Sequence, residues 1–83
     1  MRIEIIAFNK DKYFDIAVDT DNEVFLLGIP FNYGPAEHTK YYRISKKEFE
    51  LGKASPTNLN HLVDGQNFKG DGELYYSTCT LFK

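Results

Sequence analysis

Hydrophobic and polar residues alternate along residues 13–19, which is the pattern of a β-strand with one buried face. The hydrophobic side holds Phe14, Ile16 and Val18, and the opposite side holds Asp15, Ala17 and Asp19. We therefore expect a sheet that packs one face on a core and shows carboxylates to solvent on the other.

Further short hydrophobic segments are separated by turn-forming residues, and each predicts another strand. These segments are residues 2–8, 23–29, 40–44 and 73–82. The first three strands are expected to be antiparallel neighbours, because the connections between them are short. Pro30 cannot donate to a strand ladder, so it is expected to end the third strand or to mark a sheet edge.

Two short helices are expected between the fourth and the last strand. Ser45 and Glu48 have the spacing of a capping box, and Gly52 is expected to end the first helix. The second helix is expected from Pro56 to Gly65. Its hydrophobic stripe consists of Leu59, Leu62 and Val63. The order β-β-β-β-α-α-β predicts an α+β fold, an antiparallel sheet of four to five strands with two short helices on one face.

The composition is that of a small protein with an aromatic core. A chain of 83 residues predicts a single domain over 1–83 with no deep pocket. The 7 phenylalanines and 6 tyrosines build a core quickly, and tyrosines also suit an interface. Cys79 is the single cysteine, the N-terminal residues lack a signal-peptide pattern, and the hydrophobic segments are too short to span a bilayer. We therefore expect a cytoplasmic protein without membrane contact.

The net charge of −2 argues against nucleic-acid binding, because such proteins need a concentrated basic surface. The nearest approach to an RNA-binding set lies in a short tyrosine-rich and basic stretch. Its residues are Tyr41, Arg43, Lys46 and Lys47. A small RNA-binding domain is therefore a minor alternative.

Residue types that serve metal or catalytic sites are present, but not in the spacing that such sites need. Asp19, Asp21 and Glu23 begin like a calcium loop, yet the positions that need Gly and Glu hold Val24 and Pro30. The residues that match no zinc or nucleophile pattern are His38, His61 and Cys79. We expect no catalytic residue, no metal and no cofactor, and a protein that is not an enzyme.

Acidic residues are concentrated near the N-terminus, where the first thirty residues hold six acids against three bases. An acidic surface raises the rate and specificity of association with a basic partner, while aromatic side chains supply affinity. The alternative is a solubilising outer face that binds nothing. The residues expected to bind a partner are Asp11, Tyr13, Asp15, Asp19, Asp21, Glu23 and Tyr33.

As an acidic, tyrosine-rich and cysteine-poor domain, the chain is similar in general character to small intracellular immunity proteins that neutralise bacterial toxins. Phage-encoded inhibitors of host defence proteins are similar too. The resemblance implies a cytosolic inhibitor whose carboxylates occlude a basic toxin, such as a nuclease. The alternative is a structural module that forms a homodimer through a sheet edge. On the lead hypothesis, replacing Asp15 and Asp19 with lysine is expected to abolish binding and to leave the thermal midpoint unchanged.

Overall fold

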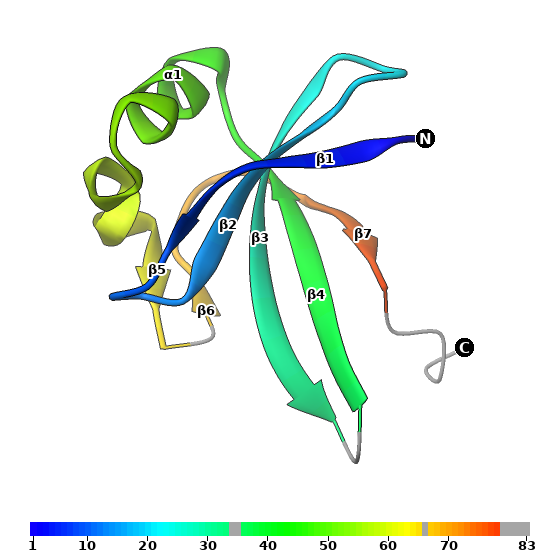
Figure 1. The fold of residues 1–83 in the computed structure, drawn as a ribbon, viewed down its shortest axis with the longest axis vertical. Helices are drawn as coiled ribbons and strands as arrows, with labels where there is room; N and C mark the ends of the chain where they lie inside the picture. Colours follow the sequence, from blue (N-terminus) through cyan, green and yellow to red (C-terminus); the bar gives the residue numbers. More distant parts are fainter. Residues whose placement is uncertain (34–35, 66, 79–83) are drawn as a thin grey trace.

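An antiparallel five-stranded sheet forms the body of the protein, which confirms the expected α+β fold. The computed structural model describes residues 1–33, 36–65 and 67–78. The sheet order is β1-β2-β3-β4-β7, so β1 and β7 are the edge strands (Figure 1). The strands are β1 (Ile3–Asn9), β2 (Phe14–Asp19), β3 (Val24–Tyr33), β4 (Ala36–Arg43) and β7 (Leu74–Ser77).

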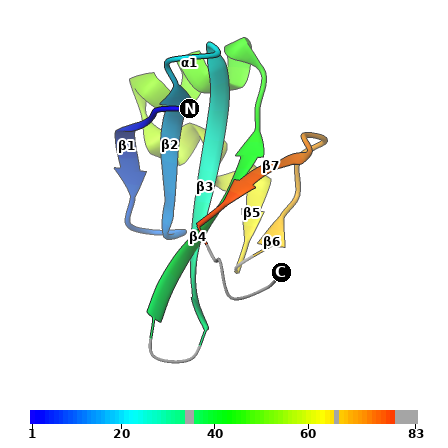
Figure 2. The ribbon, with the colours of Figure 1, turned by 90° about the vertical axis from the view of Figure 1, so that its right-hand side faces the viewer.

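The segment between β4 and β7 covers one face of this sheet, and Figure 2 shows its helices behind the strands. It contains helix α1 (Lys46–Ala54), the 3₁₀ helix η1 (Pro56–Leu62), and a small hairpin of β5 (Val63–Asp64) and β6 (Asn67–Phe68). The main core between sheet and helices consists of Phe14, Ile16, Leu27, Ile29, Ile44, Phe49, Leu59, Leu62 and Val63. Within the described ranges, no helix has the length and hydrophobicity to cross a membrane.

The predicted capping box begins α1. The Ser45 hydroxyl accepts a hydrogen bond from the Glu48 backbone N–H at 3.1 Å, and the Glu48 carboxylate accepts one from the Ser45 N–H at 2.9 Å. The expected helix ends are corrected. α1 continues past Gly52, which is buried where an added Cβ would collide with Ile16 and Leu59. Gly65 lies in the turn between β5 and β6 with a φ of 63°, which suits glycine, and η1 ends before it.

Two strand boundaries are also corrected. β3 continues through Pro30 to residue 33, and β4 begins at residue 36 rather than 40. Pro30 has no backbone N–H to donate. It is tolerated because the pairing of β3 with β2 ends at Gly28, so no hydrogen bond to β2 is lost at residue 30. Pro30 therefore marks an edge, as one of the two expectations had it. The last strand is β7, and of its predicted range residues 79–82 lie outside the described residues.

The two sides of β2 predicted from alternation are confirmed, but the expectation that its carboxylate side faces solvent is wrong, because Asp15 and Asp19 are both buried. Phe14 and Ile16 point into the core beneath the helices. Ala17 lies on the opposite face, where it forms a second, smaller buried cluster with Leu26 and Tyr41. Figure 2 shows this face toward the viewer, with β7 crossing in front of β4. We call it the open face, because neither α1 nor η1 covers it.

Candidate functional site

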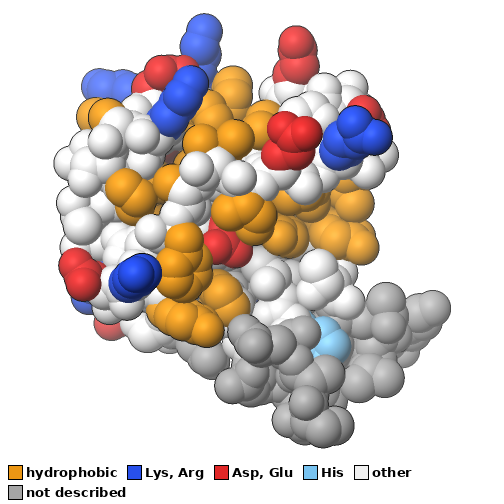
Figure 3. Space-filling view, in the orientation of Figure 1, with side chains coloured by type: hydrophobic (Ala, Val, Ile, Leu, Met, Phe, Trp, Pro, Cys, Tyr) orange, Lys and Arg blue, Asp and Glu red, His pale blue; other side chains and the backbone are white. Residues whose placement is uncertain are grey.

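Four of the eight exposed large hydrophobic side chains among the described residues lie on the open face. The strand register places Ile5 beside Ala17 and Phe8 beside Asp15. The exposed members, with their exposed fractions, are Ile5 (52%), Phe8 (40%), Tyr13 (54%) and Tyr76 (37%). Figure 3, in the orientation of Figure 1, shows several groups of hydrophobic side chains at the surface, one of them beside a carboxylate. Large exposed hydrophobic residues that adjoin one another mark surfaces that bind other molecules.

One row of residues runs across all five strands of the open face. The register pairs Phe8 of β1 with Asp15 of β2, Asp15 with Gly28 of β3, Gly28 with Tyr41 of β4, and Tyr41 with Tyr76 of β7. Directly paired residues point to the same face with their Cβ atoms about 5 Å apart. We call these five residues the transverse row. It places one carboxylate between aromatic rings.

Asp15 is the unusual member of the transverse row, because it is only 9% exposed. Among the described residues its carboxylate takes part in no hydrogen bond or ion pair. Its oxygens retain some contact with solvent. Burial without a partner penalises the charged form and raises the pKa of Asp15 to about 6. Buried carboxylates are normally paired, so a cation or a donor from another molecule would stabilise the charged form of Asp15.

Aromatic rings line both sides of this carboxylate. Gly28 has no side chain, and the Tyr41 ring fills the space above it, with Cε1 only 2.7 Å from where a Cβ would lie. The pKa of Tyr41 is raised by its burial and by the negative charge of Asp15. On the other side the rings of Phe8 and Tyr13 meet edge to face, with centroids 5.3 Å apart. These contacts hold aromatic walls next to Asp15.

Tyr13 is held in a backbone conformation that its residue type rarely adopts. Its φ is 59°, in the left-handed region, at the end of the turn between β1 and β2. Strain of this kind persists when the surroundings impose it, and it is found often at binding sites. Here it directs an exposed ring toward Phe8 at the rim of the transverse row.

Asp19 has a structural role, which corrects the expectation of a solvated carboxylate at this position. Its side chain is fully buried and accepts hydrogen bonds from four groups. The donors are the Asn22 amide (2.9 Å), the Tyr75 hydroxyl (2.5 Å), and the backbone N–H groups of Arg2 (3.2 Å) and Asp21 (3.1 Å). Led by Asn22 and Tyr75, these bonds hold the pKa of Asp19 well below its usual range. Asp19 has no bonding capacity left for a partner.

The bond between Tyr75 and Asp19 also shapes the open face. β2 and β7 are separated by β3 and β4, so a flat sheet would hold them about 14 Å apart. A bulge against Tyr41 and Tyr42 redirects Tyr75, which packs on the cluster of the open face. The sheet therefore curls toward its open face at this end, and Tyr75 closes that end of the concave side.

The remaining predicted site residues are not brought together. Asp11 is exposed in the turn before β2, whereas Asp21 and Glu23 are exposed in the turn after it, about 20 Å away. Asp21 also forms an ion pair with the Met1 amino group at 3.0 Å. Tyr33 ends β3, but its side chain lies outside the described part. The acids thus form two separate groups at opposite ends of β2.

The sequence did not reveal the other members of the transverse row. Phe8 and Tyr76 lie in segments that are hydrophobic at nearly every position, so alternation does not say which side is exposed. Gly28 acquires its role only from the ring packed above it. Predicting the transverse row requires the strand register, and the pattern of hydrophobic and polar residues does not determine that register.

The RNA-binding alternative is not supported by the positions of its residues. Tyr41 is 8% exposed, too buried to stack a base. The Arg43 guanidinium lies over the Tyr75 ring at 5.8 Å, at the closed end of the open face. Lys46 and Lys47 begin α1 in the covering layer. The basic and aromatic residues of this set therefore do not share one surface.

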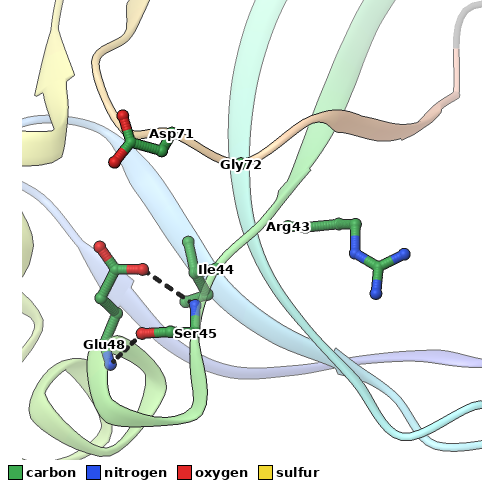
Figure 4. Close-up of a pocket in the computed structure, with 6 residues that line it drawn as sticks. All are labelled: Arg43, Ile44, Ser45, Glu48, Asp71 and Gly72. Atoms are coloured by element: carbon green, nitrogen blue, oxygen red, sulfur yellow. Dashed lines mark hydrogen bonds between the residues drawn. The ribbon is translucent and has the colours of Figure 1, made fainter.

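A cleft lies beside the start of α1, and Figure 4 shows its lining. The lining residues are Arg43, Ile44, Ser45, Glu48, Asp71 and Gly72. The Glu48 carboxylate is engaged by the Ser45 N–H, and Arg43 points away from both Glu48 and Asp71 in Figure 4. The residues that the structure describes contain no group of three or more His, Cys, Asp or Glu able to hold a metal ion. Of the polar side chains that line this cleft, Ser45 and Glu48 form the helix cap.

The open face is therefore the candidate site, built on the transverse row with Ile5 and Tyr13 beside it. Comparison with protein-family models, with curated proteins and with solved structures found no match for this chain.

Proposed function

We propose that this protein is a small cytosolic inhibitor that binds a basic protein through its open face and acts by occlusion. An immunity protein that neutralises a bacterial toxin, such as a nuclease, is the form of this proposal that the general character of the chain favours. The observation that carries it is Asp15, a nine-tenths buried residue whose carboxylate has no partner among the described residues and lies beside exposed hydrophobic and aromatic side chains. Aromatic anchors around a desolvated charge are typical of the centre of a protein interface.

The charge of the site favours a basic partner. Asp15 lacks a counter-charge within the described residues, and burial under a partner would make an unpaired carboxylate costly. A cation on the partner would remove that cost. The exposed acids Asp11, Asp21 and Glu23 lie at the two ends of β2 and would raise the association rate with the same kind of partner.

A comparison of two exposed hydrophobic positions tests the proposal. Ile5 lies on the open face, and Leu51, with a similar exposed fraction of 44%, lies on α1. The wild-type chain, Ile5→Ser and Leu51→Ser are immobilised, and proteins retained from lysates of the source cells are identified by mass spectrometry. We expect a basic protein that the wild type and Leu51→Ser retain and Ile5→Ser loses.

The retained protein is then purified, and its own activity is titrated with the chain. Inhibition complete at one equivalent is the expected result, with Ile5→Ser inactive as an inhibitor. Full activity in the presence of saturating chain would contradict inhibition. Equal loss of binding in both serine variants would contradict the assignment to the open face.

A homodimer through a sheet edge is the second candidate, because β1 is an edge strand with Ile5 and Ile6 exposed. A register shift between Ile5 and Ala7 interrupts this strand, and bulges on edge strands hinder pairing with another chain. Light scattering after size exclusion separates the candidates. A stable dimer that Ile5→Ser does not affect would favour edge pairing.

A further inference from the structure

We infer that the transverse row is a receptor for one arginine side chain of the partner protein, with Asp15 as the acceptor and Tyr41, Phe8 and Tyr13 as the walls. This inference rests on the proposed function, because it names the chemistry that the open face recognises. It is a statement about a single subsite, so it can fail while the proposed function holds.

The first step is the geometry of the subsite. Asp15 lies between Phe8 on β1 and Gly28 on β3, and its neighbour Tyr41 covers Gly28 from β4. The absence of a side chain at residue 28 lets the Tyr41 ring lie close to Asp15, and the two are near enough for the carboxylate charge to affect the phenol. The result is a carboxylate at the floor with aromatic rings on both sides.

The second step is that the residues which the structure describes do not supply the cation. In the described part, Asp15 has no ion pair. Lys40 lies over the Phe31 ring at 5.0 Å, and Arg43 lies over the Tyr75 ring at 5.8 Å. Both of these cations are therefore already placed on other rings, and the carboxylate stays available to an incoming group.

The third step is the choice of arginine over lysine. A guanidinium is planar, stacks on aromatic rings and is more weakly hydrated than an ammonium, so it loses less on entering a half-buried site. It can also donate two parallel hydrogen bonds to one carboxylate. Aromatic walls with a carboxylate floor match both properties.

The test uses arginine itself as the probe. ¹⁵N-labelled protein is titrated with N-acetyl-arginine amide and, separately, with N-acetyl-citrulline amide, which has the same shape but no charge. We expect saturable shift changes at Phe8, Asp15, Gly28 and Tyr41 with a dissociation constant on the order of millimolar for arginine, and none for citrulline. Equal responses to the two probes would overturn the inference.

Two variants carry the same change of charge. Asp15→Asn is expected to abolish the arginine response, whereas Asp64→Asn, at an exposed acid of β5, is expected to keep it. Thermal melts of both variants confirm that they are folded. An arginine response that survives in Asp15→Asn would also overturn the inference.

The pH dependence gives an independent reading. Arginine needs the ionised carboxylate, so binding is expected to weaken as the pH falls below about 6, the pKa of Asp15. The groups that face Asp15 are Phe8 of β1, Gly28 of β3 and Tyr41 of β4. Of these Tyr41 is titratable, and its raised pKa keeps it neutral over this range. Affinity that does not change between pH 5 and pH 8 would count against Asp15 as the acceptor.

Measurements on the partner that Ile5→Ser loses distinguish the proposed function from the arginine subsite. If Asp15 receives an arginine of that partner, Asp15→Asn lowers the affinity roughly 30-fold or more. If Ile5→Ser abolishes binding and Asp15→Asn does not, the open face is the interface but the arginine subsite is wrong. If no protein is retained by the wild type and lost by Ile5→Ser while the arginine amide still binds at Asp15, arginine binding at the subsite stands and the proposed function fails.

Discussion

Asp15 and Asp19 lie four residues apart on the same side of β2, yet their surroundings shift the two carboxyl pKa values in opposite directions. Asp19 accepts four hydrogen bonds, which favour its charged form. Asp15 is buried among rings without a donor, which favours its neutral form. The expectation that replacing both Asp15 and Asp19 with lysine leaves the thermal midpoint unchanged therefore needs correction. Lysine at Asp19 would remove a buried hydrogen-bond network and unfold the protein. Asp15 alone is the residue to change.

Asp15→Asn is expected to stabilise the protein at neutral pH. The folded-state pKa is about 6 against a model value of 3.8, so the folded form binds the proton more tightly than the unfolded form. The contribution of Asp15 to the free energy of unfolding is therefore greatest below about pH 4 and falls as the pH rises through 6. The shift corresponds to about 3 kcal/mol at most, and contact with solvent reduces this to about 1–2 kcal/mol at pH 7. Urea unfolding at pH 7.5 and pH 4 measures the gain, which should vanish at the lower pH.

Asp64→Asn is the control for that measurement, since an exposed carboxylate contributes little at either pH. An Asp15→Asn protein that is less stable than the wild type at pH 7.5 would show that the carboxylate has a donor in solution. The expected combination, a more stable protein that no longer binds, would separate the role of Asp15 in binding from any role in folding.

Asn9, the last residue of β1, connects the β1–β2 turn to η1 and is expected to be costly to replace. Its amide donates to the Pro56 carbonyl at 3.1 Å and to the Asn60 side chain at 2.6 Å, and its oxygen accepts from two turn N–H groups. It is 2% exposed, so these groups would be left without partners. Asn9→Ala is expected to lower the free energy of unfolding by about 2–4 kcal/mol.

Asn58→Ala is the matched control for Asn9→Ala in urea titrations. Asn58 is exposed and donates one hydrogen bond, to the Leu51 carbonyl at the end of α1. Its loss is expected to cost about 0.5–1 kcal/mol. Equal costs for the two substitutions would mean that the bonds between Asn9 and η1 do not hold the β1–β2 turn in place.

At the scale of elements, α1 depends on a glycine in its last turns. Ala is normally favoured over Gly in a helix by about 1 kcal/mol. At Gly52 an added methyl would meet Ile16 of β2 and Leu59 of η1, and overpacking of this kind costs about 1–3 kcal/mol. We expect Gly52→Ala to destabilise the protein by about 1–2 kcal/mol in chemical unfolding, with Glu50→Ala on the exposed side near neutral. A stabilised Gly52→Ala protein would mean that α1 can move away from β2.

The same glycine shows which features of the elements the sequence could predict. The capping box needs only Ser45 and Glu48, three residues apart, and local spacing was enough to predict it. Alternation predicted the two sides of β2, because every second residue of this strand, Phe14 and Ile16 among them, belongs to the main core. The position of Gly52 within α1 follows from contacts with Ile16 and Leu59, which are distant in sequence. The helix end was therefore misjudged.

The candidate site was predictable only where it depends on a single strand. Asp15 and Tyr13 were identified because the acidic side of β2 is visible in the chain. Phe8, Gly28 and Tyr76 join them through four strand pairings, two of which contain a register shift. A shift of one residue turns every side chain to the other face, so the transverse row could not be read from alternation.

At the scale of the whole molecule, the curl of the sheet determines the shape of the open face. The chain leaves the sheet after β4, covers one face with helices and returns as β7 on the other edge. Tyr75 of β7 then reaches Asp19 of β2 across the open face. This single contact joins the second strand to the last, so it affects the curvature of the surface that we propose binds a partner.

Tyr75→Phe is therefore expected to loosen β7, whereas Tyr76→Phe is the control, because its ring stacks on Tyr41 rather than reaching Asp19. Donation to Asp19 raises the pKa of Tyr75 and lowers that of Asp19, so the contact needs a neutral phenol and a charged carboxylate. Its stabilisation is present above about pH 4, the usual Asp value, and is lost below it as Asp19 is protonated. It is also lost as the pH rises beyond about 10, the usual Tyr value.

The thermal midpoint of Tyr75→Phe should thus fall below that of Tyr76→Phe between these limits and approach it outside them. Amide exchange gives the spatial reading: the N–H groups of Arg43 and Thr78, which bond across β4 and β7, should exchange faster in Tyr75→Phe alone. Equal midpoints and equal exchange in the two variants would show that β4 pairing holds β7 without Tyr75. In that case the curvature of the open face comes from the twist of the strands, and changes at Tyr75 would leave partner binding intact.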